Sequence, residues 1–493
     1  MNNVARSGAG AGLSRPLEKS MSQTITIEPV TRIEGHAKVT VRVDDAGKVE
    51  QARFHVNEFR GFEKFCEGRL FYEMPLITER ICGICPVSHH LASAKACDQI
   101  VGGQIPRTAA LLRELMHMGQ IIQSHSMHFF ELAGPDLLLG FDADPAIRNV
   151  VGLVAAAPEL ALKAVRLRKF GQEIIARLGE RKVHPNFAVP GGVNRKLRSA
   201  DRDAILAEVD TMIGSVQEGL AVMKGWMEKH SAEMATFASF PSAYMGMVGE
   251  DNALALYDGM IRIVDANGRQ IEHFDGRQYL QHVAEHVEGW SYLKFPYLRK
   301  LGFPQGTYRV GPLGRLNACD RIDTPLAQRE LDAFRQLGGE GLPEGSLYYH
   351  YARLIEDLYA VERVRQILED REVMSNDIRN NAAATSHEGV GVIEAPRGTL
   401  WHHYWVDDQG RLERVNLIVA TGNNNYAMSR AVEEVAKACV DGNHITEGAL
   451  NRVEAAIRAY DPCLSCSTHA WGRMPLEMVV IDRGGEPIAR AAR

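Results

Sequence analysis

Three short runs of alternating apolar and polar residues lie near the start of the chain. Residues 24–30, 37–43 and 49–56 alternate with a period of two, which is typical of strands with one buried face. The sequence Asp44-Asp45-Ala46-Gly47 separates the last two runs and predicts a hairpin turn. Residues 31–36, TRIEGH, form a charged interruption between the first two strands.

Much of the remaining chain has apolar residues at three-to-four spacing, which predicts helices. The stretches with this pattern are residues 106–134, 158–179, 199–237, 347–373 and 430–460. Several are apolar on more than one face, as expected for helices buried at the centre of a bundle. Two further hairpins are predicted at residues 260–274, turning at 265–268, and at residues 400–420, turning at 407–410. The predicted fold class is α+β, a central bundle of long helices with antiparallel β-hairpins and sheets at its periphery.

Composition changes this picture little. Of 493 residues, 45% are hydrophobic and 24% are charged, which is ordinary for a globular protein with a large core. The formal net charge of −6 gives no reason to expect a nucleic-acid or anionic-membrane partner. No apolar run approaches the ~18 residues of a transmembrane helix. Residues 1–20 are small, polar and glycine-rich and lack the apolar core of a secretory signal, so we expect a disordered tail, with Met21 as a candidate start.

Two Cys-x-x-Cys pairs, each followed by a histidine, are the strongest chemical signal. They lie in RICGICPVSHH, residues 80–90, and in DPCLSCSTH, residues 461–469. This spacing lets both sulfurs of a pair bind one ion, so four soft thiolates from distant loops can close a single metal site. Because the two pairs must then meet, we expect residues 21–469 to form a single domain. The other four cysteines are isolated, which suggests a reduced intracellular protein and not a disulfide scaffold.

The cysteine spacing alone leaves other interpretations open. A four-cysteine structural zinc site has the same ligands, but such a zinc usually stabilises a small unit that lacks a core. A thioredoxin-like redox pair is less favoured, since neither pair lies in a βαβ pattern. The chain has no glycine-rich nucleotide-binding motif after a strand. It also has no spare group of cysteines for an iron–sulfur cluster.

Six motifs, in order, resemble those of the large subunit of [NiFe]-hydrogenases. They are residues 28–36 (EPVTRIEGH), 58–63 (EFRGFE), the first cysteine motif, 190–193 (PGGV), 394–398 (EAPRG) and the second cysteine motif. The resemblance spans roughly residues 24–481. The segments at residues 290–297, 309–315 and 400–404 resemble the cytoplasmic, bidirectional NAD-reducing branch. The related large subunit of respiratory complex I shares that fold but lacks the four cysteines, which argues against it.

The resemblance implies a nickel bound by four thiolates and an iron that carries carbonyl and cyanide ligands. It assigns Cys82 and Cys463 as terminal nickel ligands, and Cys85 and Cys466 as bridges to the iron. Soft sulfur ligands suit nickel in a low oxidation state. The resemblance implies that hydrogen is then split heterolytically. The proton would move to Cys463 and from there to Glu34.

Further roles around the centre follow from the same resemblance. Arg397 would overhang the open metal position, where a fixed cation can polarise bound hydrogen and donate to a cyanide. The Asp461 carboxylate would lie near it. His89 would donate to a bridging sulfur, and Thr421 falls at the position of a cyanide-binding hydroxyl.

Glu34 and the C-terminal motif complete the expected site. Arg32 and His36 flank Glu34 in the sequence, which makes a proton relay there reasonable. Glu63, His469 and the backbone carbonyl of Leu417 match a magnesium site beside the C-terminal histidine. The resemblance implies that these three residues bind magnesium; carboxylate and carbonyl oxygens suit this ion, and imidazole is a less usual ligand for it.

The resemblance also implies partners and processing. Electrons would pass to a small subunit with an iron–sulfur cluster, and then to diaphorase subunits that carry flavin and bind NAD. A maturation protease would cut after His469 once nickel-insertion proteins have acted, and residues 470–493, with a strand-like run at 476–481, would be removed. The alternatives are a cytoplasmic relative that uses NADP or a deazaflavin coenzyme, a non-catalytic hydrogen sensor, and a zinc-stabilised scaffold.

Overall fold

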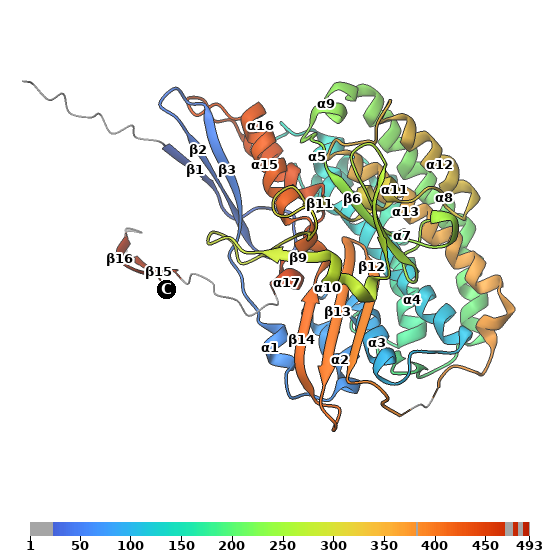
Figure 1. Ribbon diagram of the computed structural model, residues 1–493. Helices are drawn as coiled ribbons and strands as arrows, with labels where there is room; N and C mark the ends of the chain where they lie inside the picture. The colour runs from blue at the N-terminus through green and yellow to red at the C-terminus, as the bar shows by residue number, and fades with distance from the viewer. Residues whose placement is uncertain (1–22, 381–382, 469–476, 482–486, 493) are drawn as a thin grey trace, which may run out of the picture.

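Long helices form the body of the protein, and small sheets cover its sides (Figure 1). The computed structural model describes residues 23–380, 383–468, 477–481 and 487–492. The helices are α1 Phe62–Cys66, α2 Met74–Thr78, α3 Pro86–Ile100, α4 Arg107–Met127, α5 Gly134–Leu139, α6 Val150–Ala156, α7 Pro158–Gly179, α8 Ser199–Lys229, α9 Ser231–Thr236, α10 Tyr279–His282, α11 Pro312–Ala318, α12 Pro325–Gln336, α13 Tyr348–Glu369, α14 Ala420–Asn423, α15 Asn425–Cys439, α16 Glu447–Arg458 and α17 Leu464–Ser467. Within the described residues, no helix combines the length and the apolar character needed to cross a bilayer.

The strands form small, mostly antiparallel sheets, as predicted. They are β1 Gln23–Ile27, β2 Ala37–Val43, β3 Val49–Val56, β4 Ala188–Val189, β5 Gly192–Val193, β6 Ala243–Val248, β7 Met260–Val264, β8 Gln270–Phe274, β9 Val283–His286, β10 Phe295–Leu298, β11 Tyr308–Arg309, β12 Glu388–Ala395, β13 Gly398–Val406, β14 Leu412–Ile418, β15 Glu477–Ile481 and β16 Pro487–Ala492. The sheet orders are β1-β2-β3, β11-β6-β7-β8 and β12-β13-β14, with three two-stranded sheets. The short β11–β6 pair is parallel.

The helices α4 and α13 form the buried centre of the bundle. Both are buried on nearly all faces, which explains why their apolar residues are not confined to one stripe. Helix α4 continues through a π-helical turn, His128–Ala133, into α5, so the predicted helix at 106–134 is one winding path of three segments. Helix α7 has the predicted bounds. The predicted helix at 199–237 is α8 followed by α9.

Residues 430–460 are mostly helical, as predicted, but they are not continuous helix. The structure has two helices there, α15 and α16, separated by a loop at residues 440–446. The loop docks on the first hairpin, where the Gly442 amide donates to the Gly47 carbonyl at 2.8 Å. Helical periodicity cannot reveal this break, because a contact between residues far apart in the chain determines it.

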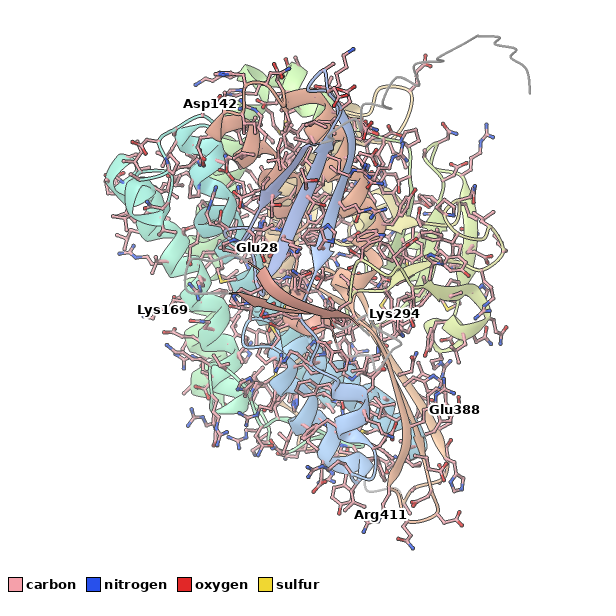
Figure 2. The ribbon with its side chains drawn as sticks, turned by 90° about the vertical axis from the view of Figure 1, so that its left-hand side faces the viewer. Glu28, Asp142, Lys169, Lys294, Glu388 and Arg411 are labelled. Carbon is pink, nitrogen blue, oxygen red and sulfur yellow. The ribbon has the colours of Figure 1, made fainter. Side chains whose placement is uncertain are left out.

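The three predicted hairpins are confirmed, and β12 is an additional strand. The hairpins are β2–β3, β7–β8 and β13–β14, and the tip of the last lies at Arg411 (Figure 2). Strand β12 pairs with β13 and packs directly on α3. A Cβ atom on Gly391 would lie 1.9 Å from the Ala92 carbonyl oxygen, so glycine is required for this close approach. Strands β12 and β13 thereby hold α3, which begins directly after the first cysteine pair.

The predicted N-terminal tail and C-terminal extension are described only in part. Residues 1–20 and Met21 lie outside the described residues, and so does His469. The predicted strand near residue 476 is found as β15, which pairs antiparallel with β16. These two strands form a sheet of their own, so among the described residues β15 is not an edge strand of a larger sheet.

Candidate metal centre

The four motif cysteines come together at one point, as the sequence predicted. The Sγ atoms of Cys82 and Cys463 are 3.3 Å apart, and those of Cys85 and Cys466 are also 3.3 Å apart. All four sulfurs lie within 4.8 Å of one another, and all four residues are buried. Among the described residues this is the one group of three or more metal-ligating side chains with such geometry.

The first motif is shaped by a turn and a helix start. Cys85 immediately precedes α3, and Pro86 occupies the first helical position, where its missing N–H is harmless. The amides of Ile84 and Cys85 donate to the Cys82 sulfur at 3.2 and 3.4 Å. These donors stabilise negative charge on Cys82, as a thiolate ligand requires.

The second motif is held against the 31–36 loop. The Glu34 amide donates to the Pro462 carbonyl at 3.4 Å, and the Leu464 amide donates to the Glu34 carbonyl at 3.1 Å. Gly35 has φ +82°, and a Cβ atom there would lie 2.7 Å from Leu464 Cβ. Only glycine allows this approach, so the TRIEGH loop is built to carry Glu34 alongside Cys463.

The thiols resist ionisation unless a cation joins them. Burial raises the pKa values of Cys463 and Cys466 well above normal, and the neighbouring sulfurs strengthen the effect for Cys463. Hydrogen bonds from Cys463 and Cys466 lower the pKa of Cys82 instead. The cluster therefore favours one thiolate among thiols, and a soft cation that displaces the remaining protons would supply the missing charge.

Arg397 and Asp461 form a buried pair beside the sulfurs. Arg397 donates from Nε to the Asp461 carbonyl at 2.6 Å and from Nη2 to the Asp461 carboxylate at 2.9 Å. Burial alone would lower the pKa of Arg397. Asp461 and the motif cysteines outweigh burial and raise this pKa well above its ordinary value, so Arg397 is a fixed cation. The Nη1 atom of Arg397 has no hydrogen-bond partner in the described chain. Arg397 and Asp461, both singled out from the sequence, are thus in direct contact.

Arg315 supports the turn that presents Arg397, and sequence reasoning did not single it out. It pairs with Glu356 at 2.6 Å and with Glu394 at 2.9 Å, and all three side chains are inaccessible to solvent. Its Nη atoms also donate to the carbonyls of Ala395 and Pro396, the two residues before Arg397. Although burial alone would raise it, Arg315 and His125 lower the pKa of Glu356 to about 2. The sequence could have pointed to Arg315 because it lies in the segment at residues 309–315 that resembles the NAD-reducing branch.

Glu34 lies at the second motif, but the charged residues on either side of it in the sequence contact other side chains. The Ser465 amide donates to the Glu34 carboxylate at 3.0 Å. Arg32 turns away and binds Asp136 at 2.5 Å, while His36 is exposed and contacts Glu58 at 2.6 Å. The two residues that flank Glu34 in the sequence therefore contact other carboxylates, because this turn sends consecutive side chains in different directions.

His89 belongs to a buried line of hydrogen-bonding groups. Its Nδ1 atom lies 3.0 Å from His402 Nε2, and His402 Nδ1 lies 2.6 Å from the Tyr404 hydroxyl. Tyr404 in turn donates to Ser93 at 2.9 Å. A partner on Nδ1 fixes the orientation of the His89 ring where it lines the cavity beside Cys85. His402 and Tyr404 were not predicted, since α3 and β13 are far apart in the sequence.

A small cavity adjoins the sulfurs. It is lined by Cys85, Ser88, His89, Ala395, Pro396, Arg397, Leu400, Val419, Ala420, Thr421, Cys463 and Cys466. The Thr421 hydroxyl accepts from the Cys463 amide at 3.0 Å, so its own proton remains available to donate. Soft thiolates on one side and unused donors among apolar walls on the other fit a metal centre with small acceptor ligands.

The predicted magnesium ligands are brought together in part. The Leu417 amide donates to the Glu63 carboxylate at 2.7 Å, so α1 and β14 meet there. His469 lies outside the described residues. Two of the isolated cysteines, Cys66 and Cys319, are buried thiols, and burial raises the pKa of each to about 12.

This fold and site match a known family. A family model described as nickel-dependent hydrogenase matches residues 60–148 and 245–469, and one described as HoxL-like matches residues 24–59. The chain belongs to the nickel-dependent hydrogenase family. Residues 149–244, which include α6 to α9, lie outside the matched ranges.

Individual relatives narrow the comparison. The chain is 46% identical to the NAD-reducing hydrogenase HoxS subunit beta of Cupriavidus necator, over 96% of this chain and 100% of that protein. It is 44% identical to one subunit of the F420-non-reducing hydrogenase vhu of Methanococcus voltae, over 85% of this chain and 99% of that one. The crystal structure of an NAD⁺-reducing [NiFe]-hydrogenase in the H2-reduced state superposes with a TM-score of 0.89 at 46% identity, covering 91% of this chain and 99% of that one.

Proposed function

We propose that this chain is the catalytic subunit of a cytoplasmic [NiFe]-hydrogenase that splits H2 reversibly and passes electrons through partner subunits to NAD. The observation that carries the proposal is the meeting of four buried cysteine sulfurs beside the fixed Arg397 cation. Nickel would be held by the sulfurs of Cys82, Cys85, Cys463 and Cys466. The sulfurs of Cys85 and Cys466 would also bind an iron that carries one carbonyl and two cyanide ligands. When bound, that centre supplies the site at which H2 is polarised and cleaved.

The residues of this chain orient the site and move the proton. Cys463 holds the proton first, because its backbone pairs with that of Glu34 in an isolated β-bridge, which keeps the two residues side by side. The Ser465 amide orients the Glu34 carboxylate, which is half-buried and therefore stands between the dry centre and the solvent side. Arg397 stays charged at every physiological pH, and the apolar walls around it exclude water.

The electron path leaves the chain. The sequence has no nucleotide-binding loop or cluster of spare cysteines, so electrons need a small subunit with an iron–sulfur cluster and diaphorase subunits with flavin and NAD. NAD as the acceptor is supported by the relatives whose names carry that activity. A relative that uses NADP or a deazaflavin coenzyme is the alternative within the same class.

Infrared spectroscopy and metal analysis test the proposal together. The purified complex should contain nickel, should contain more iron than nickel because the partner subunits carry iron–sulfur clusters, and should show one carbonyl and two cyanide bands. A zinc-only protein without these bands would refute the nickel–iron centre and favour the structural zinc alternative. Bands without hydrogen turnover would identify a sensor instead of an enzyme.

We also infer that the active subunit ends at His469 and that residues 21–469 are its mature domain. Glu63 and the strand β14 that carries Leu417 are already joined by a hydrogen bond, which supports a magnesium site that a terminal His469 would complete. Among the described residues, the β15–β16 hairpin pairs only within itself, as suits a removable extension.

Mass spectrometry tests the processing step. The subunit in active enzyme should end at His469, whereas subunit made without nickel should retain Arg493. An intact Arg493 in fully active enzyme would contradict the inference. Magnesium analysis of the same two samples should find the ion only in the processed form.

A further inference from the structure

Ser88 is a buried hydroxyl for which the roles described so far have no use. It is the third residue of α3 and is inaccessible to solvent. Its Oγ atom finds no hydrogen-bond partner within the described part of the chain. Leaving a buried hydroxyl unpaired destabilises a protein, so its presence calls for a partner.

Ser88 does not use the usual partner of a helical serine. Such a serine normally donates to the carbonyl four residues earlier, as Ser126 does to Ile122 at 2.6 Å. The equivalent acceptor for Ser88 is the Ile84 carbonyl. That carbonyl already accepts from the side-chain amides of Gln120 at 3.0 Å and Gln123 at 2.7 Å. A carbonyl oxygen has two lone pairs, so its capacity is filled.

The remaining direction for the hydroxyl is the cavity beside the sulfurs. Ser88 lines this cavity together with Cys85 and Cys466, the two cysteines assigned as bridges to iron. Arg397, with its unpartnered Nη1, and Thr421, with a hydroxyl proton available, line it as well. The other walls are apolar, apart from the His89 ring and the sulfur of Cys463. Three donors thus surround a space whose natural occupant is a small group with acceptor atoms.

We propose that Ser88 donates a hydrogen bond to a cyanide ligand of the iron and is a third ligand-orienting donor beside Arg397 and Thr421. The proposal rests on the proposed nickel–iron centre. The nitrogen of an iron-bound cyanide is a much better hydrogen-bond acceptor than the oxygen of an iron-bound carbon monoxide. A donor beside one iron position therefore favours cyanide at that position. Ser88 thereby orients the iron ligands and tunes the electron density that they leave on the metal.

The test compares Ser88→Ala with Ser88→Thr, which keeps a hydroxyl, and with Ser126→Ala, which removes a buried hydroxyl that its own helix satisfies. The infrared spectrum of the assembled enzyme is the main readout, together with nickel and iron content. The free energy of unfolding of the metal-free precursor is the second readout. We expect Ser88→Ala to retain the bands but to displace one of the two cyanide bands more than the carbonyl band, while Ser88→Thr restores its position.

Folding separates this role from a structural one. The Ser88→Ala precursor should be as stable as the unsubstituted precursor or more so, because an unpaired hydroxyl is removed, whereas Ser126→Ala should lose stability without moving a band. If the bands of Ser88→Ala coincide with those of the unsubstituted enzyme, the proposal is wrong while the nickel–iron centre stands. Absence of carbonyl and cyanide bands from the unsubstituted enzyme would refute the proposed function itself.

Assembly defects also give an answer. A centre lost from Ser88→Ala but present in Ser88→Thr would support the donor role, since the hydroxyl alone distinguishes the two in hydrogen bonding. A centre lost from both variants would show that the position needs the size of serine, and would overturn the proposal.

Discussion

Replacing any one of Cys82, Cys85, Cys463 and Cys466 by serine is expected to abolish hydrogen turnover. A hydroxyl has nearly the shape of a thiol but is a hard, weak ligand for nickel. Loss of a residue that only supports a metal ligand typically costs about 10–100-fold, so loss of a ligand itself should lower activity by more than ~100-fold. Nickel content per subunit and hydrogen uptake measure the effect.

The structure supplies matched controls for these variants. Cys97 is as buried as the four ligands, but its thiol donates to the Phe71 carbonyl at 3.1 Å, away from the cluster. Cys97→Ala and Cys319→Ala should cost about 1 kcal/mol of stability and leave turnover per nickel unchanged. Full activity in any of the four ligand variants would remove that residue from the proposed centre. Loss of activity in the Cys97 and Cys319 controls would point to folding instead.

Glu34→Gln should suppress both turnover and hydrogen/deuterium exchange while the infrared bands persist. The amide keeps the shape of the carboxylate and can still accept from the Ser465 amide, so the loop that carries it should remain in place. What is lost is the ionisable group, and proton transfer by a positioned side chain typically contributes ~10²–10⁴-fold. The expected signature is therefore a silent enzyme with an intact metal centre.

Glu58→Gln is the control for this second prediction. Glu58 contacts His36 of the same loop at 2.6 Å, and its side chain is about a third exposed. It should exchange hydrogen at the unsubstituted rate. If Glu34→Gln also exchanged normally, the proton would have to leave the centre by another group, and Cys463 would no longer have Glu34 as its acceptor.

The elements that local pattern predicted well are those whose neighbours lie close in sequence. The hairpins turning at residues 44–47, 265–268 and 407–410 and the helix at 158–179 follow from alternation, turn residues and helical periodicity. The break between α15 and α16 escaped because the first hairpin holds that loop. Strand β12 escaped because its glycines are explained only by the approach of α3.

The sequence by itself determined the metal-binding chemistry of this protein. The four cysteines, their spacing and the order of six motifs identified the ligands and the hydrogenase family, because ligand type and local spacing are written in the chain. The same reasoning named Arg397 and Asp461, which the structure places in direct contact.

Only the tertiary structure decided what surrounds those ligands. It turned Arg32 and His36 away from Glu34, joined His89 to His402 and Tyr404, and brought Arg315 under the turn before Arg397. It also left Ser88 facing the cavity, because two glutamines from α4 occupy the carbonyl it would otherwise use. Side-chain direction and hydrogen-bond competition depend on residues more than 30 positions away in the chain, and no local pattern encodes them.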